Sequence, residues 1–241
     1  KGKGELFDYL RAHQGTAFVF WSDQYLQQMS AGIQTVVRYG FGDADITGRA
    51  LPQNSGANQA FLQVELMAGC ENRRLQTQLV GDYNLPNVLA AVAIGKHFGI
   101  AEEKICKAIS EYVPANSRSQ LVEKDGNQVI LDAYNANPSS MKAAIENFAA
   151  LPGANKILLL GAMAELGDES LEEHRQIVAL IGRHTWQHVV LVGGDFAKLS
   201  HPFIQLPDSA AAKEWLQQQK ISGAQLLVKG SRSMQMEKVL Q

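Results

Sequence analysis

Four short apolar runs in the second half of the sequence, separated by helix-like stretches, constrain the fold more than any other feature. The runs are residues 128–133, 156–161, 188–193 and 225–229. After the first of them, Met141, Ile145 and Phe148 recur at helical spacing. This alternation of strand and helix is typical of a doubly wound sheet with helices on both faces. The sequence therefore predicts an α/β domain with a mostly parallel sheet over residues 114–241.

Two of the expected helices carry start signals. Asn137 followed by Pro138 predicts a helix that begins with an asparagine cap and a proline in its first turn. Ser170 and Glu173 have the spacing of a capping box, which predicts another helix start at Ser170.

Residues 1–113 have a different pattern, in which short strands and turns precede helices. The strand candidates are residues 17–21, 35–39 and 60–67. Gly42, Gly48 and the polar residues 52–58 are interpreted as turns. Helices are expected from Leu85 to Gly99 and over residues 102–112. The chain opens on a helix-like stretch without an initiator methionine, so we expect it to be part of a longer protein.

Composition excludes some classes of function. The formal net charge is -2 and no basic block is present, which argues against a nucleic-acid partner. No apolar run reaches the roughly 20 residues of a membrane helix. Cys70 and Cys106 lack metal-ligand spacing and are interpreted as reduced thiols of a cytoplasmic protein.

The stretch LDAYNANPSSM, residues 131–141, concentrates polar side chains where a strand gives way to a helix. Asp132, Tyr134, Asn135 and Asn137 lie here. In an open α/β sheet, ligands bind at the carboxyl ends of strands, which favours a binding site. Asparagine, proline and aspartate are also common turn and helix-start residues, so position alone leaves a purely structural alternative open.

Five segments, in order along the chain, resemble the Mur ligases, in particular those that join D-alanyl-D-alanine to UDP-N-acetylmuramoyl-tripeptide. The segments are KGELF (3–7), GDYNLPNVLAAVAIG (81–95), DAYNANPSSM (132–141), LGAMAELG (160–167) and VKGSRSMQMEKV (228–239). The resemblance implies that residues 1–113 are the C-terminal part of a central ATP-binding domain. It also implies that residues 114–241 are a Rossmann-like C-terminal domain.

The resemblance implies an ATP-dependent amide ligase of peptidoglycan precursor synthesis that works through an acyl phosphate. ATP and Mg²⁺ are the implied cofactors, and UDP-N-acetylmuramoyl-tripeptide and D-alanyl-D-alanine the implied substrates. Such chemistry needs cations to stabilise phosphoryl charge. We expect a cytoplasmic monomer that neither spans a membrane nor binds nucleic acid.

Residues of the first half match family positions that bind metal and nucleotide. Lys3 aligns with a lysine that the family carbamylates, and it would then help to hold magnesium; a solvated terminal lysine is the alternative. Asn84 and Asn87 match asparagines that contact the adenine end of ATP, although Tyr83 stands where the family usually has histidine. Asn84 fits a helix cap equally well.

Residues of the second half match the family's remaining contacts with ATP. Arg118 falls where the family has an arginine that reaches the nucleotide phosphates, a role that suits its planar, permanently charged group. Asp132 would accept hydrogen bonds from the ribose hydroxyls, and Asn135 and Asn137 would lie near ribose and phosphate. Tyr134 is expected to pack at the end of the strand.

The last two motifs are expected to face the incoming dipeptide. Glu165, Lys229, Ser231 and Arg232 are the candidate contacts, with Arg232 as the partner of the carboxylate. The family often has aspartate where this chain has Ala162. Other residues of these motifs are expected to have structural roles. Gly161 and Gly167 are interpreted as turn residues, and Met234 and Met236 as packing residues.

Other features restrict what the chain is expected to do. The sequence contains no P-loop of the form G-x-x-G-K-T/S, so residues 1–241 alone are expected to be inactive. His184 and His188 are not expected to share a helix, which argues against a metal site. His174 is interpreted as a surface or interdomain residue. The alternatives are a ligase of the same superfamily that adds a single amino acid or makes folylpolyglutamate, and a non-catalytic nucleotide-binding module.

Overall fold

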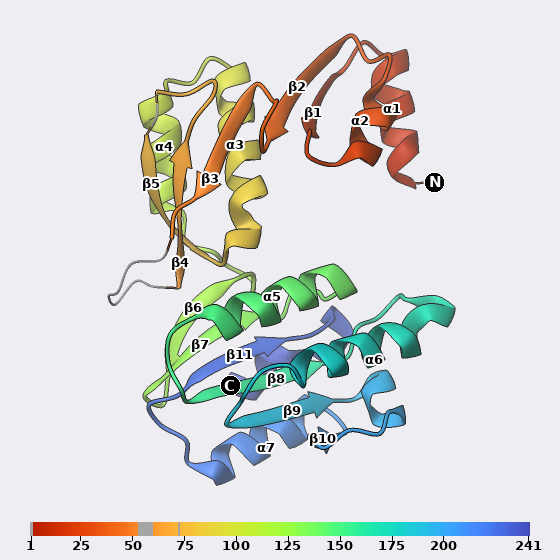
Figure 1. Cartoon of the computed structure of the whole chain (residues 1–241), viewed down its shortest axis with the longest axis vertical. Helices are drawn as coiled ribbons and strands as arrows, with labels where there is room; N and C mark the ends of the chain where they lie inside the picture. The colour runs from red at the N-terminus through yellow and green to blue at the C-terminus, as the bar shows by residue number, and fades with distance from the viewer. Residues whose placement is uncertain (1, 53–59, 72) are drawn as a thin grey trace. The chain divides into compact units, whose positions relative to one another are not determined.

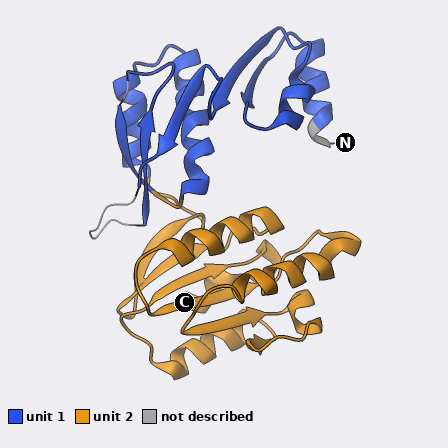
Figure 2. Ribbon diagram, in the orientation of Figure 1, with its two compact units in different colours: residues 1–78, 82–112 blue, residues 79–81, 113–241 orange. Residues whose placement is uncertain are grey.

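The computed structural model describes residues 2–52, 60–71 and 73–241, except for the side chains of residues 2 and 3 (Figure 1). Most of the predicted turn at residues 52–58 therefore lies outside the described residues. The chain divides into two compact units (Figure 2). The first unit contains residues 1–78 and 82–112, and the second contains residues 79–81 and 113–241.

The sheet of the first unit has the strand order β1-β2-β3-β4-β5. Its helices and strands are α1 (Gly2–Ala12), β1 (Thr16–Phe20), α2 (Gln24–Ser30), β2 (Thr35–Gly40), β3 (Ile46–Ala50), β4 (Phe61–Leu66), β5 (Arg74–Val80), α3 (Leu85–His97) and α4 (Glu102–Glu111). The three strands and two helices predicted here are confirmed to within two residues at each end. Ala17 and Val19 alternate into the core and pack with Ile33, as expected of a half-buried strand.

The prediction of a turn at Gly48 was wrong, because this glycine lies inside β3. A β-carbon at this position would lie 2.9 Å from the backbone oxygen of Glu65 and 2.9 Å from a side-chain carbon of Leu89. Glycine is therefore used here for close approach between β3, β4 and α3.

The second unit carries a six-stranded sheet of order β10-β9-β8-β11-β7-β6. Its helices and strands are β6 (Gln120–Lys124), β7 (Asn127–Asp132), α5 (Pro138–Ala150), β8 (Lys156–Gly161), α6 (Ser170–Ile181), β9 (His188–Val192), β10 (Ile204–Leu206), α7 (Ser209–Gln219) and β11 (Gln225–Lys229). Every neighbouring pair is parallel except β6 with β7. The predicted α/β class with a mostly parallel sheet is confirmed.

Helices cover both faces of this sheet. Alternate residues of the central strands, such as Leu131, Leu159 and Val228, pack with Ala212 of α7 and with Met236. The intervening residues point to the other face, where α5 and α6 lie side by side (Figure 1). All six residues of β8 are buried, which explains why only apolar residues follow Lys156 in this strand.

Both predicted helix starts are confirmed, but only the first has the predicted cap. Asn137 caps α5 as predicted, since its side chain accepts a hydrogen bond from the backbone N–H of Ser140. α6 begins at Ser170 as predicted, whereas the capping box proposed there was wrong. A 3₁₀ turn over Gly167–Glu169 leads directly into α6, and Glu169 at the cap position makes no side-chain capping hydrogen bond.

Candidate functional site

Three of the predicted motifs begin at the carboxyl ends of neighbouring strands. β8, β11 and β7 are adjacent and parallel, and Lys229 is in register with Leu160 on one side and with Asp132 on the other. Their loops therefore start at one edge of the sheet, which we call the carboxyl edge. Ligands bind at this edge in open α/β sheets.

A buried ion pair lies beneath the carboxyl edge. The Lys229 ammonium nitrogen is 2.5 Å from Oδ2 of Asp132, and it also donates to the backbone oxygen of Asn135 at 3.3 Å. Lys229 is only 1% exposed. The structure thus places its ammonium group against Asp132 and not at the surface, where the predicted contact with a substrate would require it.

The second oxygen of Asp132 holds the segment that precedes β6. Oδ1 accepts a hydrogen bond from the backbone N–H of Ser119 at 3.0 Å. Ser119 has a φ of +48°, and Ser117 a φ of +56°, so this segment is in the left-handed region at two serines. A carboxylate has about four acceptor sites, so Asp132 can still accept a hydroxyl of a ligand.

Arg118 lies over the ring of Tyr134. Its guanidinium carbon is 3.6 Å from the ring centroid, which is a cation–π contact. The backbone N–H of Tyr134 donates to the oxygen of Ser117 at 3.1 Å, which ties the two segments together. The prediction that Tyr134 packs at the strand end was wrong: its side chain is 41% exposed and supports Arg118.

Asn135 and Asn137 are exposed at the start of α5. Oδ1 of Asn135 accepts the N–H of Ala136 at 2.9 Å, and Oδ1 of Asn137 accepts the N–H of Ser140 at 2.8 Å. α5 begins six residues after Asp132 in the sequence. Its N-terminus favours negative charge, because the helix dipole is positive at that end. Four predicted nucleotide contacts, Arg118, Asp132, Asn135 and Asn137, thus come from two segments linked by hydrogen bonds.

The loop after β8 places Glu165 at the surface. Glu165 is exposed and has a φ of +63°. Gly167 has a φ of +56°, so its prediction as a turn residue is confirmed. The same prediction for Gly161 was wrong, since this residue ends β8 and a β-carbon there would lie 2.7 Å from Cγ of Met236. Gly161 allows close packing instead.

Ser231 and Arg232, which follow β11, have different environments. Ser231 is buried, and its hydroxyl donates to the backbone oxygen of Ala162 at 2.7 Å. Arg232 is exposed and forms an ion pair with Glu237 at 2.9 Å. Of the residues predicted to contact the dipeptide, Arg232 and Glu165 are therefore the accessible ones. The predicted packing roles of Met234 and Met236 are confirmed.

The interpretation of His174 as a surface or interdomain residue was wrong. This residue is fully buried, and its Nε2 accepts the backbone N–H of Met163 in the loop after β8 at 3.0 Å. A signal was present in the sequence: His174 has the spacing i, i+3, i+7 with Ile177 and Ile181, the buried face of α6.

The predicted nucleotide contacts of the first unit lie at the start of α3. Asn84 is buried at the cap position, and its Oδ1 accepts a hydrogen bond from the amide of Asn87 at 3.0 Å. The side chain of Asn84 does not cap the helix. Lys3 lies on α1, but its side chain lies outside the described part of the structure.

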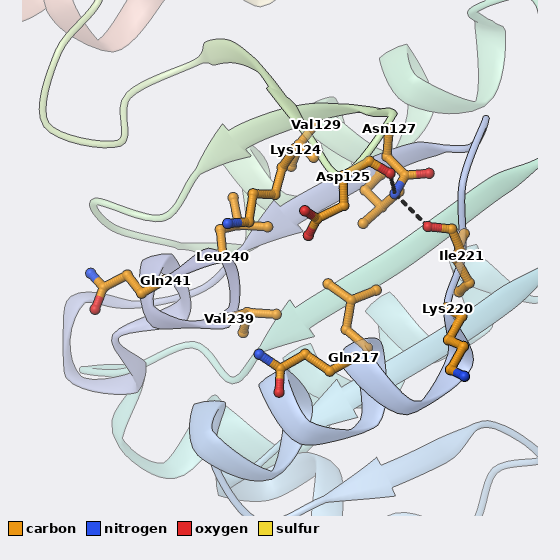
Figure 3. A pocket seen from close by; sticks show the side chains of 12 residues that line it. Lys124, Asp125, Asn127, Val129, Gln217, Lys220, Ile221, Val239, Leu240 and Gln241 are labelled. Carbon is orange, nitrogen blue, oxygen red and sulfur yellow. Dashed lines mark hydrogen bonds between the residues drawn. The ribbon is translucent and has the colours of Figure 1, made fainter.

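A hollow of about 370 Å³ lies at the other end of the second unit's sheet (Figure 3). Asn127 at the start of β7 lines it and donates to the oxygen of Ile221 at 2.8 Å. No predicted site residue with a described side chain lines this hollow. Within the described residues, no group of three or more His, Cys, Asp and Glu side chains could hold a metal ion, and no helix is long and apolar enough to cross a membrane.

Comparisons with known proteins show which family and which solved structures this chain resembles. The family described as Mur ligase, glutamate ligase domain, matches residues 117–232. The UDP-N-acetylmuramoyl-tripeptide–D-alanyl-D-alanine ligase of Bacillus subtilis is 34% identical in an alignment of length 173 that covers 67% of this chain and 38% of that protein. This chain therefore spans well under half of that relative.

Two solved structures resemble the chain over most of its length. MurF from Acinetobacter baumannii has a TM-score of 0.77 and 26% identity, covering 94% of this chain and 51% of that one. MurF ligase from Thermotoga maritima in complex with ADP has a TM-score of 0.79 and 19% identity, covering 94% of this chain and 52% of that one. The second likeness shows the fold alone.

Proposed function

The chain belongs to the Mur ligase family, and we propose that it is the C-terminal part of a ligase that joins D-alanyl-D-alanine to UDP-N-acetylmuramoyl-tripeptide. Residues 1–113 would be the end of the central ATP-binding domain, and residues 114–241 the Rossmann-like C-terminal domain. The main support for this proposal is that three segments resembling ligase motifs begin at the carboxyl edge, near the start of α5.

We propose that the carboxyl edge binds ATP. Arg118 would contact the phosphates, since its permanent charge and several donors suit them. Asp132 would accept the ribose hydroxyls, and Asn135 and Asn137 would contact ribose and phosphate at the N-terminus of α5. From the first unit, Asn84 and Asn87 would contact the adenine. The Thermotoga maritima ligase, which shares this fold, was solved in complex with ADP, the nucleotide that such a reaction produces.

The proposed reaction has two steps. An oxygen of the tripeptide's terminal carboxylate attacks the γ-phosphorus of ATP, the bond to the bridging oxygen breaks, and ADP leaves. The amine of D-alanyl-D-alanine then attacks the acyl carbon of the acyl phosphate. The amine loses a proton, and phosphate leaves with the oxygen that began on the carboxylate. Arg118 would stabilise the charge that develops on the transferred phosphoryl group.

Magnesium would neutralise phosphate charge in such a reaction. The described residues do not offer it a site of their own, because no three acidic, His or Cys side chains converge and Asp132 is already paired with Lys229. We propose that a carbamylated Lys3 takes part in holding the ion, together with residues outside the described part of the chain.

The acceptor dipeptide would bind at the loops after β8 and β11. Arg232 would pair with its carboxylate and Glu165 with its ammonium group, since these two side chains are accessible. Lys229 and Ser231 would act through the backbone that they hold in place.

We propose a cytoplasmic monomer with no nucleic-acid partner. Burial raises the pKa of the Cys106 thiol, which is compatible with a reduced thiol.

Phosphate release tests the proposal. The chain with its natural upstream segment restored is given ATP, UDP-N-acetylmuramoyl-tripeptide and either D-alanyl-D-alanine or single amino acids, with residues 1–241 as the control. Turnover only with the dipeptide, and none from residues 1–241, is expected. Turnover only with a single amino acid would assign a sibling ligase. No turnover with any acceptor would favour a non-catalytic nucleotide-binding module.

A further inference from the structure

One peptide group in the loop after β8 is hydrogen-bonded at both its carbonyl and its N–H. The carbonyl, which belongs to Ala162, accepts the hydroxyl of Ser231 at 2.7 Å and the N–H of Ser231 at 3.1 Å. The N–H, which belongs to Met163, donates to Nε2 of His174 at 3.0 Å. Each of these residues is at most 5% exposed. The Ala162–Met163 peptide is therefore fixed from two separate elements, α6 and the loop after β11.

The environment of His174 selects one protonation form. Nε2 must be unprotonated to accept the N–H of Met163. Nδ1 lies 2.6 Å from the backbone oxygen of Ser170, so it must carry the proton. The ring also packs edge-on against Phe196, with centroids 4.6 Å apart. His174 is thus an oriented histidine that no step of the proposed reaction uses.

The fixed peptide lies close in sequence to both accessible acceptor residues. Glu165 is two residues beyond Met163 and has a left-handed backbone. Arg232 directly follows Ser231. The two loops also meet at their bases, because a β-carbon on Gly230 would lie 3.0 Å from the Cα of Gly161. The two loops are therefore coupled at their bases by the Ala162–Met163 peptide and by the close approach of Gly230 to Gly161.

We propose that His174 is a positioning residue for acceptor binding: by holding the Ala162–Met163 peptide against Ser231, it orients Glu165 and Arg232 toward the dipeptide. This inference rests on the proposed function. His174 touches neither the dipeptide nor ATP. Its loss therefore weakens the acceptor site more than the nucleotide site, which is built on β7 and α5.

The test compares two variants of the chain with its upstream segment restored. His174→Leu removes the acceptor for the Met163 N–H, whereas His174→Gln places a side-chain oxygen near the position of Nε2. His174→Leu is expected to raise the KM for D-alanyl-D-alanine roughly five- to tenfold, the value of about one hydrogen bond, with less than about a twofold change in the KM for ATP. His174→Gln should recover most of the loss.

His184→Leu is the matched control, because His184 is exposed beyond the end of α6. It should leave both KM values unchanged. Equal increases in the KM for the dipeptide and for ATP with His174→Leu, or no recovery with His174→Gln, would overturn the proposal and leave His174 a packing residue.

A second readout does not depend on activity. Nitrogen NMR of residues 1–241 with labelled histidine should show His174 protonated at Nδ1 and unprotonated at Nε2. The opposite tautomer would overturn the inference even in an active ligase. A wild-type protein without dipeptide-dependent turnover would instead overturn the proposed function, and the tautomer would still decide whether His174 holds the Ala162–Met163 peptide.

Discussion

Lys229 and Asp132 form a buried ion pair whose two partners are 97 residues apart in the sequence. Asp132→Asn leaves the ammonium group of a 1% exposed lysine without its counter-charge. Breaking such a pair typically costs about 3–5 kcal/mol, whereas replacing both partners with neutral groups costs much less. Asp132→Asn is therefore expected to lower the free energy of unfolding by several kcal/mol, and adding Lys229→Met should recover much of the loss.

Urea unfolding of residues 1–241 and of the three variants measures this coupling. Lys229→Met alone completes the cycle. If Asp132→Asn cost less than about 1 kcal/mol, or if the double variant were no more stable than Asp132→Asn, the ion pair would not hold the carboxyl edge together.

Tyr134 supports Arg118 by a cation–π contact at the surface, where such contacts are worth about 0.5–1 kcal/mol. Tyr134→Leu removes the aromatic ring and should let the guanidinium group move. The KM for ATP is then expected to rise about two- to fivefold in the chain with its upstream segment restored. Tyr134→Phe keeps the ring and should behave as wild type, so a Phe variant as impaired as the Leu variant would contradict this role.

Glu102, at the start of α4, holds Glu71, which follows β4 in the chain. Oε1 of Glu102 accepts the N–H of Glu71 at 2.9 Å, and Oε2 accepts the ammonium of Lys96 at 2.8 Å. Burial alone would raise the pKa of Glu102, but these hydrogen bonds outweigh it and the pKa is lowered. Burial and the nearby charge of Glu102 raise the pKa of the Cys70 thiol to about 11.

This raised pKa gives the folded state a pH dependence. A thiol that ionises near pH 9.0 when unfolded and near 11 when folded keeps its proton more tightly in the folded state. Its contribution to stability is complete below about pH 9 and is lost as the pH rises through 11. Wild type should therefore lose stability relative to Cys70→Ala over this range in chemical unfolding experiments, with Cys106→Ala as the control for the other thiol. Parallel curves for wild type and Cys70→Ala would contradict the shift.

The elements that sequence predicted best are those with one dominant physical signal. β8 is a fully buried strand that is apolar throughout after Lys156, and α3 has apolar residues at helical spacing. β6 and β5 were missed because they mix polar and charged residues, as strands with an exposed face do. The hairpin between β6 and β7 did carry a sequence signal, the dipeptide Asp125-Gly126. Both residues adopt the positive φ that a two-residue hairpin turn requires.

In the candidate site, too, local features were predicted from the sequence and long-range contacts were not. Motifs located Asp132, Asn137 and Arg232, because strand ends and helix starts are local features. The pairing of Lys229 with Asp132 depends on the register between β11 and β7, and the contact of His174 with Met163 depends on how α6 packs on the sheet. Neither of these long-range contacts is specified by the residues next to them in sequence.

We propose that the whole molecule to which this chain belongs is a ligase that works through an acyl phosphate. The chain covers 38% of its Bacillus subtilis relative and 51% of the Acinetobacter baumannii structure. We propose that its carboxyl edge contacts ATP and the acceptor. The carboxylate to be activated would be held by parts of the larger protein, so the test must use the chain with its upstream segment restored.

The most direct measurement follows the oxygen atoms of that carboxylate. UDP-N-acetylmuramoyl-tripeptide labelled with ¹⁸O in its terminal carboxylate is converted with ATP and D-alanyl-D-alanine, and the phosphate is analysed by mass spectrometry. An acyl phosphate transfers one labelled oxygen to each phosphate released and leaves the other in the new amide. Amide formation with unlabelled phosphate, or with the label in AMP, would contradict the proposed mechanism.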